Sequence, residues 1–164
     1  MSGLLTYSLE LRGQISGDSD GLLVHASAPP CTHQTYLHDD GIAARILFGD
    51  SGDEAFLEWR LLLQEDGTFS AVATIDFGHG HTLWGRTLDN GRVSGSADEH
   101  LRHGTATIHV VGGTGQFAGA TGQITSNFVL SDTGELTDNQ LGMLFLQPNG
   151  RPPSASAELT GDGG

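Results

Sequence analysis

Histidine and glutamate side chains give this sequence its clearest candidates for proton transfer. His79 and His81 are one residue apart, so on a strand their imidazoles would lie on one face, about 7 Å apart, a spacing that metal sites in β-proteins use. His109 lies in a later β-like run, and Glu10 alternates with Ser8 in the first one. We expect His81, His109 or Glu10 to polarise a carbonyl group or to move a proton.

A metal ion held by His79 and His81 is the alternative use of this pair. His100, His103 or His109 could supply a further ligand from a neighbouring strand. Histidines near turns, however, are more often solvated or hydrogen-bonded than bound to a metal. The sequence therefore predicts no bound metal and no cofactor.

Large aromatic side chains could shape a pocket for a planar or polyene substrate. Trp59, Trp84 and Phe128 are the candidates, with His79 beside them, although core packing alone would also explain the aromatic residues. Glu58 and Arg60 share the strand face opposite Trp59, and we expect this pair to be exposed. If the pair faced inward instead, it would be an acid and its electrostatic partner.

Composition and charge exclude several classes of function. Twenty acidic residues against seven basic ones give a formal net charge of -13, which repels nucleic-acid phosphates and anionic lipid surfaces. Because the chain has no lysine and a single cysteine, Cys31, it can form neither a lysine Schiff base nor an internal disulfide. No apolar run is long enough for a membrane helix, and residues 1–11 lack the features of a secretory signal. We expect a soluble, cytoplasmic protein with no nucleic-acid or membrane partner.

Short β-like runs separated by turn residues organise the chain. With 25 glycines the chain turns often, which favours strands over helices. In one run the apolar residues Phe69, Ala71 and Ile75 occupy alternate positions, and Ser70 and Thr74 point the other way, as on a half-buried strand. The pattern predicts an all-β antiparallel fold, either a barrel or a sandwich. We expect one domain over residues 1–147 and a flexible C-terminal tail at 148–164. The predicted strands are residues 4–11, 22–26, 42–48, 55–63, 69–77, 81–88, 93–98, 105–111, 123–130 and 139–146.

The densest motif is a glycine-rich segment, Val110-Val111-Gly112-Gly113-Thr114-Gly115-Gln116-Phe117-Ala118-Gly119-Ala120-Thr121-Gly122. A dinucleotide site would need a helix directly after the glycines, yet the strand-like run 123–130 follows. The segment resembles instead the signature loop of the allene oxide cyclase and dirigent superfamily of β-barrels. Gly80-His81-Thr82-Leu83-Trp84-Gly85 is similar to the strand before that loop, and the resemblance extends over about residues 66 to 146.

This resemblance implies an antiparallel up-and-down β-barrel of about eight strands around a small-molecule cavity, assembled as a homodimer or homotrimer. Glu10 would then lie near the barrel mouth. Small members of this group resemble cofactor-free cyclases of natural-product metabolism. We therefore predict a cyclase or isomerase that holds the reacting ends of one hydrophobic molecule together inside the cavity. The alternative is a non-catalytic protein that carries or steers a hydrophobic ligand, as dirigent proteins do.

Overall fold

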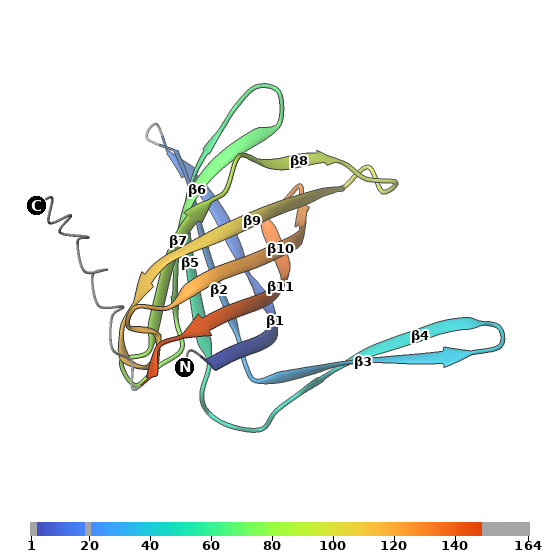
Figure 1. Cartoon of the computed structure of the whole chain (residues 1–164). Coiled ribbons are helices and arrows are strands. Elements are labelled where there is room, and N and C mark those ends of the chain that lie inside the picture. The colour runs from blue at the N-terminus through green and yellow to red at the C-terminus, as the bar shows by residue number, and fades with distance from the viewer. Residues whose placement is uncertain (1–2, 19–20, 149–164) are drawn as a thin grey trace, which may run out of the picture.

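The computed structural model describes residues 3–18 and 21–148, which form strands joined by turns and one short 3-10 helix (Figure 1). None of the helices in these two ranges is long and apolar enough to cross a membrane. The elements are β1 (Gly3–Asp18), β2 (Gly21–Ala28), β3 (Cys31–His38), β4 (Gly41–Phe48), β5 (Ala55–Leu63), β6 (Thr68–Asp76), β7 (Thr82–Thr87), β8 (Gly91–Gly95), β9 (Leu101–Gly113), η1 (Gly115–Phe117), β10 (Thr121–Ser131) and β11 (Glu135–Leu146).

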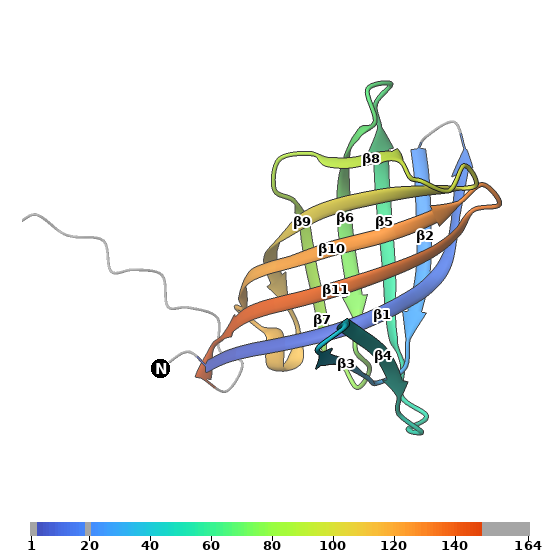
Figure 2. The same ribbon diagram turned by 90° about the vertical axis from the view of Figure 1, so that its right-hand side faces the viewer.

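Eight strands close into an antiparallel barrel, as predicted. Their order around the barrel is β1, β2, β5, β6, β7, β9, β10 and β11, and the pairing of β11 with β1 completes the ring. Each strand pairs with its neighbour along the chain, except where β3–β4 and β8 are inserted. β8 crosses one end of the barrel and pairs with β9 and β6, whereas β3 and β4 pair only with each other and project from the barrel wall (Figure 2).

Alternation of apolar and polar residues decides which side of each strand faces the interior. In β6, Phe69, Ala71, Ala73 and Ile75 are buried, and the residues between them are exposed. In β5, Trp59 points inward with its alternate neighbours. The predicted exposed pair beside it is confirmed on the outer wall, where Arg60 Nε lies 3.2 Å from Glu58 Oε1, and their side chains are 75% and 40% exposed.

Three aromatic rings in the barrel interior face glycines on neighbouring strands. Phe69 pairs in register with Gly91, and Phe128 pairs with Gly104. Tyr7 and Gly142 form a third pair of this kind. In each case a Cβ on the glycine would overlap the ring opposite, so only glycine leaves the ring its place. Part of the high glycine content therefore serves packing inside the barrel and not turns.

Two segments differ from the sequence-based expectations. His79 and His81 do not share a strand face, because residues 77–81 form a loop between β6 and β7. Its turn places Gly78, His79 and Gly80 at φ values of 83°, 55° and 82°, outside the β region. The second difference is β3, because none of the predicted strands includes residues 31–38. Ser19 and Asp20 and the tail from residue 149 onward lie outside the described residues.

Candidate functional site: a polar cluster in the barrel interior

A carboxyl group lies at the centre of the apolar barrel interior. Asp138 occupies an inward position on β11, next to Leu136 and Gln140 in the same inward row, and it has no exposed surface. Its Oδ1 accepts a hydrogen bond of 2.6 Å from Ser126 Oγ on β10. Its Oδ2 accepts one of 2.8 Å from Gln140 Nε2. Because these two neighbours belong to rigid strands, they fix the plane of the carboxyl group.

Burial changes the proton affinity of Asp138. Desolvation raises the pKa of this carboxyl from 3.8 to about 6, against the opposing effect of hydrogen bonds from Ser126, Gln140 and the Asn127 backbone. No ion pair reaches Asp138 within the part of the chain that the structure describes. A carboxyl with this pKa can hold or release a proton near neutral pH, which suits general acid–base catalysis.

Three buried polar atoms of interior side chains lack a hydrogen-bond partner among the described residues. They are the hydroxyl of Tyr7, Nε1 of Trp59 and Oε1 of Gln140. Burial, and then the charge of Asp138, raise the pKa of Tyr7 far above its ordinary value, so its hydroxyl remains a neutral hydrogen-bond donor. Buried polar atoms usually have hydrogen-bond partners. Two unpaired donors and one unpaired acceptor in the same interior therefore indicate a binding site for a polar group of a ligand.

Aromatic rings border this cluster toward the end of the barrel that β8 crosses, which is the upper end in Figure 1. Phe128 pairs in register with Asp138, and its ring meets that of Trp59 edge to face at 5.8 Å between centroids. Phe69 lies 6.4 Å from Trp59. The cavity that these rings border at the upper end has a volume of about 40 Å³, room for one or two waters. This is far below the roughly 300 Å³ or more that ligand pockets usually measure, so a small molecule would need an aromatic ring to move before it could occupy this end of the interior.

The predicted pocket residues divide between the two sides of the wall. Trp59 and Phe128 lie in the interior, fully or nearly fully buried. Trp84 lies outside and is 39% exposed, because Leu83 and its alternate neighbour Gly85 take the inward positions of β7. The indole of Trp84 instead covers Gly112 on the outer surface. It therefore cannot line the barrel interior as predicted.

The two histidines of the 77–81 loop lie at the lower end of the barrel. His81 Nδ1 accepts a 3.0 Å hydrogen bond from the Gln116 N–H, and its ring meets Phe117 edge to face. His79 is largely exposed, with Nε2 3.7 Å from an Asp53 carboxylate oxygen. The structure does not bring either imidazole to Asp138. Among the described residues, no group of three histidine, cysteine, aspartate or glutamate side chains is placed to hold a metal ion.

The other two predicted catalytic residues lie on the outer wall. His109 is exposed on β9 and borders a hollow with Met143 and Phe145. Glu10 is only 5% exposed, yet it lies on the outer face of β1, where Oε1 accepts a 2.6 Å hydrogen bond from Arg12 Nη2. Glu10 borders a hollow between β1 and the projecting β3–β4 segment on the outside of the barrel, so its low exposure does not place it at the barrel mouth.

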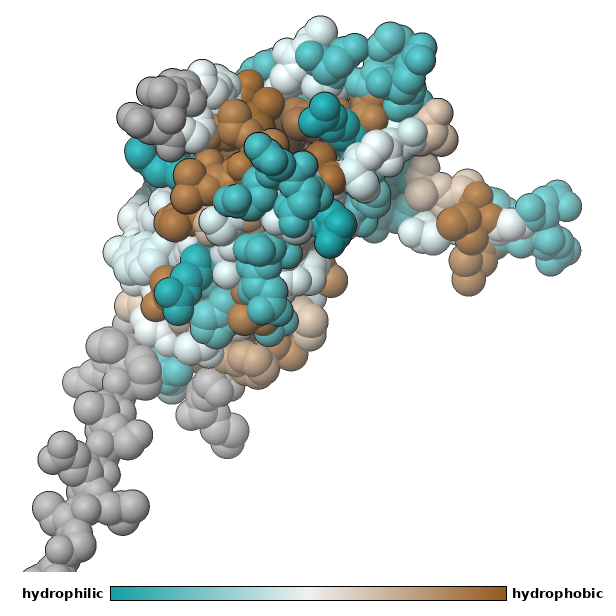
Figure 3. Space-filling view, turned by 90° about the horizontal axis from the view of Figure 1, so that it is seen from above, coloured by the Kyte–Doolittle hydropathy of each residue, from teal (hydrophilic) through white to brown (hydrophobic). Residues whose placement is uncertain are grey.

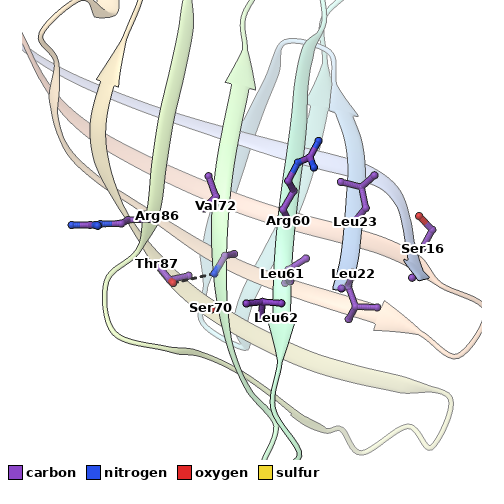
Figure 4. A pocket seen from close by; sticks show the side chains of 13 residues that line it. Ser16, Leu22, Leu23, Arg60, Leu61, Leu62, Ser70, Val72, Arg86 and Thr87 are labelled. Atoms are coloured by element: carbon purple, nitrogen blue, oxygen red, sulfur yellow. Dashed lines mark hydrogen bonds between the residues drawn. The ribbon is translucent and has the colours of Figure 1, made fainter. Parts of the chain in front are cut away.

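A further hollow opens on the outer wall over β2, β5, β6 and β7 (Figure 4). Arg60 and Arg86 stand at this hollow beside Leu23, Leu62 and Val72. The hollow is open to solvent, and none of the unpartnered polar atoms described above borders it. The interior cluster is therefore the stronger candidate site.

Sequence reasoning missed the central residues of this cluster, namely Asp138, Ser126, Gln140 and Tyr7. The predicted final strand began at residue 139, whereas β11 begins at Glu135. If the strand is started at Glu135, the alternation of Leu136 and Leu144 places Asp138 and Gln140 on the inward face, so the sequence pattern could have identified both residues.

No protein-family model, no curated protein and no solved structure matches this chain.

Proposed function

We propose that this protein is an isomerase or cyclase that binds a hydrophobic carbonyl compound in the barrel interior and moves a proton with Asp138. The observation that carries the proposal is the interior cluster itself. It combines a buried carboxyl group of raised pKa with unpaired hydrogen-bonding atoms of Tyr7, Gln140 and Trp59. An interior built only for stability would be expected to pair or omit such groups.

The chemistry follows from these groups. The Asp138 carboxylate takes a proton from the carbon next to the carbonyl, and the electrons of that C–H bond move to the carbonyl oxygen as an enolate forms. The Tyr7 hydroxyl donates a hydrogen bond to the developing oxyanion. Where a carbon–carbon double bond is conjugated with the enolate, Asp138 then returns its proton to the far carbon of that system, and the resulting shift of the double bond completes an isomerisation. For ring closure, the enolate carbon instead attacks a second carbonyl carbon of the same molecule, and Asp138 protonates the resulting alkoxide.

Two further features support this function. The chemistry uses only side chains of the chain itself and needs no cofactor. The likeness of the Val110–Gly122 segment to the signature loop of the allene oxide cyclase and dirigent superfamily favours a small-molecule cyclase or a ligand-steering protein. A natural-product intermediate with a reactive carbonyl is the class of substrate that fits both features.

Hydrogen–deuterium exchange of a simple ketone tests the proposal. The probe is 2-tetralone in D2O, with loss of the α-proton signal followed by NMR. We expect wild-type protein to accelerate exchange over buffer, and Asp138→Asn to remove about 100-fold or more of that acceleration, the usual contribution of a positioned base. Tyr7→Phe should lower the rate while exchange remains measurable, because only the oxyanion donor is lost.

Glu58→Gln and His109→Ala are the matched controls, since they remove titratable groups from the outer wall. Both should exchange at the wild-type rate. A wild-type rate in Asp138→Asn, or no acceleration by the wild type, would contradict the enzymatic proposal. In a Trp84→Phe background, the fluorescence of Trp59 reports whether the ketone enters the interior. Entry without exchange would identify a carrier.

A further inference from the structure

The segment formed by β3 and β4, residues 31–48, is a two-stranded arm with two unlike faces. In register, Leu37 pairs with Ile42 and Thr35 with Ala44, and these residues share one face with Ile46 and Phe48. The opposite face mixes polar residues with Tyr36, Ala43 and Leu47, and on it Arg45 Nε donates a 3.0 Å hydrogen bond to Gln34 Oε1. The first face is therefore the more apolar of the two.

The base of the arm is fixed on its own barrel. Near the base, the His33 ring bonds on one side to Ser8 Oγ of β1 at 3.0 Å and on the other to Asn139 Oδ1 of β11 at 3.1 Å. The guanidinium of Arg12 lies 5.4 Å from the centre of the Phe48 ring. These contacts set the direction in which the rest of the arm projects.

The outer half of the arm packs against none of the other residues that the structure describes. Leu37 and Ile42 continue the apolar face beyond the barrel, and they are 81% and 73% exposed. Figure 3 shows the arm standing clear of the barrel, with hydrophobic residues along its length and a hydrophilic tip. A two-stranded hairpin is marginally stable in water by itself. A surface that covers the apolar face would stabilise the hairpin and remove these side chains from water.

A complementary apolar surface lies on the same side of the barrel. Outward residues of β1 and β11 form it: Leu4, Leu141, Met143 and Phe145 are between 46% and 59% exposed. Three of them border the hollow over β9, β10 and β11. Figure 2 looks onto this wall and shows the arm starting at its lower edge and projecting toward the viewer. We call this surface the apolar wall.

The arm is long enough to reach a second copy. From His33 to Asp39 at the tip, six residues extend about 20 Å, and the outer part of this length stands clear of its own barrel.

We propose that this protein forms a two-fold dimer in which the arm of each copy lies along the apolar wall of the other. Because arm and wall are on the same side, two copies facing each other can exchange both arms in one symmetric interface. Leu37 and Ile42, together with the four exposed wall residues, supply roughly 700 Å² per copy, so the dimer would bury roughly 1,400 Å², within the range of stable interfaces.

Sedimentation velocity at concentrations from 1 to 50 μM tests the dimer. We expect the wild type to sediment at twice its chain mass of 17.2 kDa. Leu37→Asp on the arm and Met143→Asp on the wall should each weaken association by more than about 100-fold, because each buries a charge without a partner. Far-UV circular dichroism should be unchanged, since both side chains are exposed in the single chain.

Val72→Asp is the matched control, because Val72 is 58% exposed on β6, away from the apolar wall. It should leave the dimer intact. A monomeric wild type would overturn the proposal and would indicate an arm that serves its own barrel. A dimer that survives Leu37→Asp would place the interface elsewhere. A dimer lost in Leu37→Asp but kept in Met143→Asp would show that arms pair with arms, and would overturn docking on the wall.

Discussion

Replacing Asp138 with asparagine should stabilise the protein at neutral pH. The folded protein raises the pKa of this carboxyl from 3.8 to about 6, so the native state binds the proton more tightly than the unfolded chain. The contribution of Asp138 to the free energy of unfolding therefore falls as pH rises from about 4 to about 6, and this loss is complete above that range. A shift of this size corresponds to about 3 kcal/mol.

Asparagine retains the shape of the neutral acid and can keep the two side-chain hydrogen bonds. Its Oδ1 accepts from Ser126, and its Nδ2 can donate to Gln140 once that amide turns to present its unpartnered Oε1. We therefore expect Asp138→Asn to match the wild type near pH 4 and to exceed it by up to about 3 kcal/mol at pH 7. A variant that gains stability while losing exchange activity is typical of a functional position.

Urea denaturation between pH 4 and pH 8, followed by circular dichroism at one protein concentration, measures this difference. With a typical urea dependence, 3 kcal/mol moves the midpoint by about 1 to 2 M. The quantity to compare is the difference between variant and wild type at each pH, because the other carboxyl groups are common to both. A difference that does not grow between pH 4 and pH 7 would refute the assignment of a raised pKa to Asp138.

Two further experiments test other parts of the fold. Hydrogen bonds from the Thr68 hydroxyl and N–H lower the pKa of Asp66, so its charged form stabilises the native state. Asp66→Asn should therefore lower the urea midpoint at neutral pH, and the deficit should disappear as pH falls through the carboxyl range, the opposite sign to Asp138. Gly104→Ala should destabilise the protein by about 1 to 3 kcal/mol, because the added methyl would overlap the Phe128 ring. Adding Phe128→Leu should recover part of that loss in a double-mutant cycle, whereas Gly95→Ala, with nothing within 4 Å of its Cβ, should have little effect.

Sequence periodicity predicted the barrel strands best where large apolar residues occupy alternate positions. Phe69, Ala71 and Ile75 identify the inward face of β6, and the same alternation places Trp59 inside. In β7 the pattern is ambiguous, because the inward position after Leu83 is Gly85, and the large neighbour Trp84 suggests the wrong face. A glycine in the inward row removes the side chain by which the face could be recognised.

The candidate site was hidden for a different physical reason. Inward positions are expected to be apolar, so Asp138 and Gln140 are assigned to a turn or an outer face unless their partners are known. Their hydrogen bonds come from β10 and from within β11, and the register of β10 against β11 is a tertiary property. Of the two strands of the arm, β4 was predicted and β3 was not. Most residues of β3 are exposed, so burial imposes no alternating pattern on its sequence.

The glycine–aromatic pairs bear on how a substrate would reach Asp138. Phe128 and Phe69 rest on the bare backbone of Gly104 and Gly91, so each ring occupies the space that a side chain at the glycine would take. The present cavity beside them is about 40 Å³. Turning one such ring out of the interior would release a space comparable to the roughly 150 Å³ that accommodates benzene in a protein core. Because Phe128 is also the register neighbour of Asp138, movement of that ring would open the upper end and uncover the carboxyl group in the same step. We therefore expect substrate to enter from the upper end, with Phe128 as the side chain that it displaces.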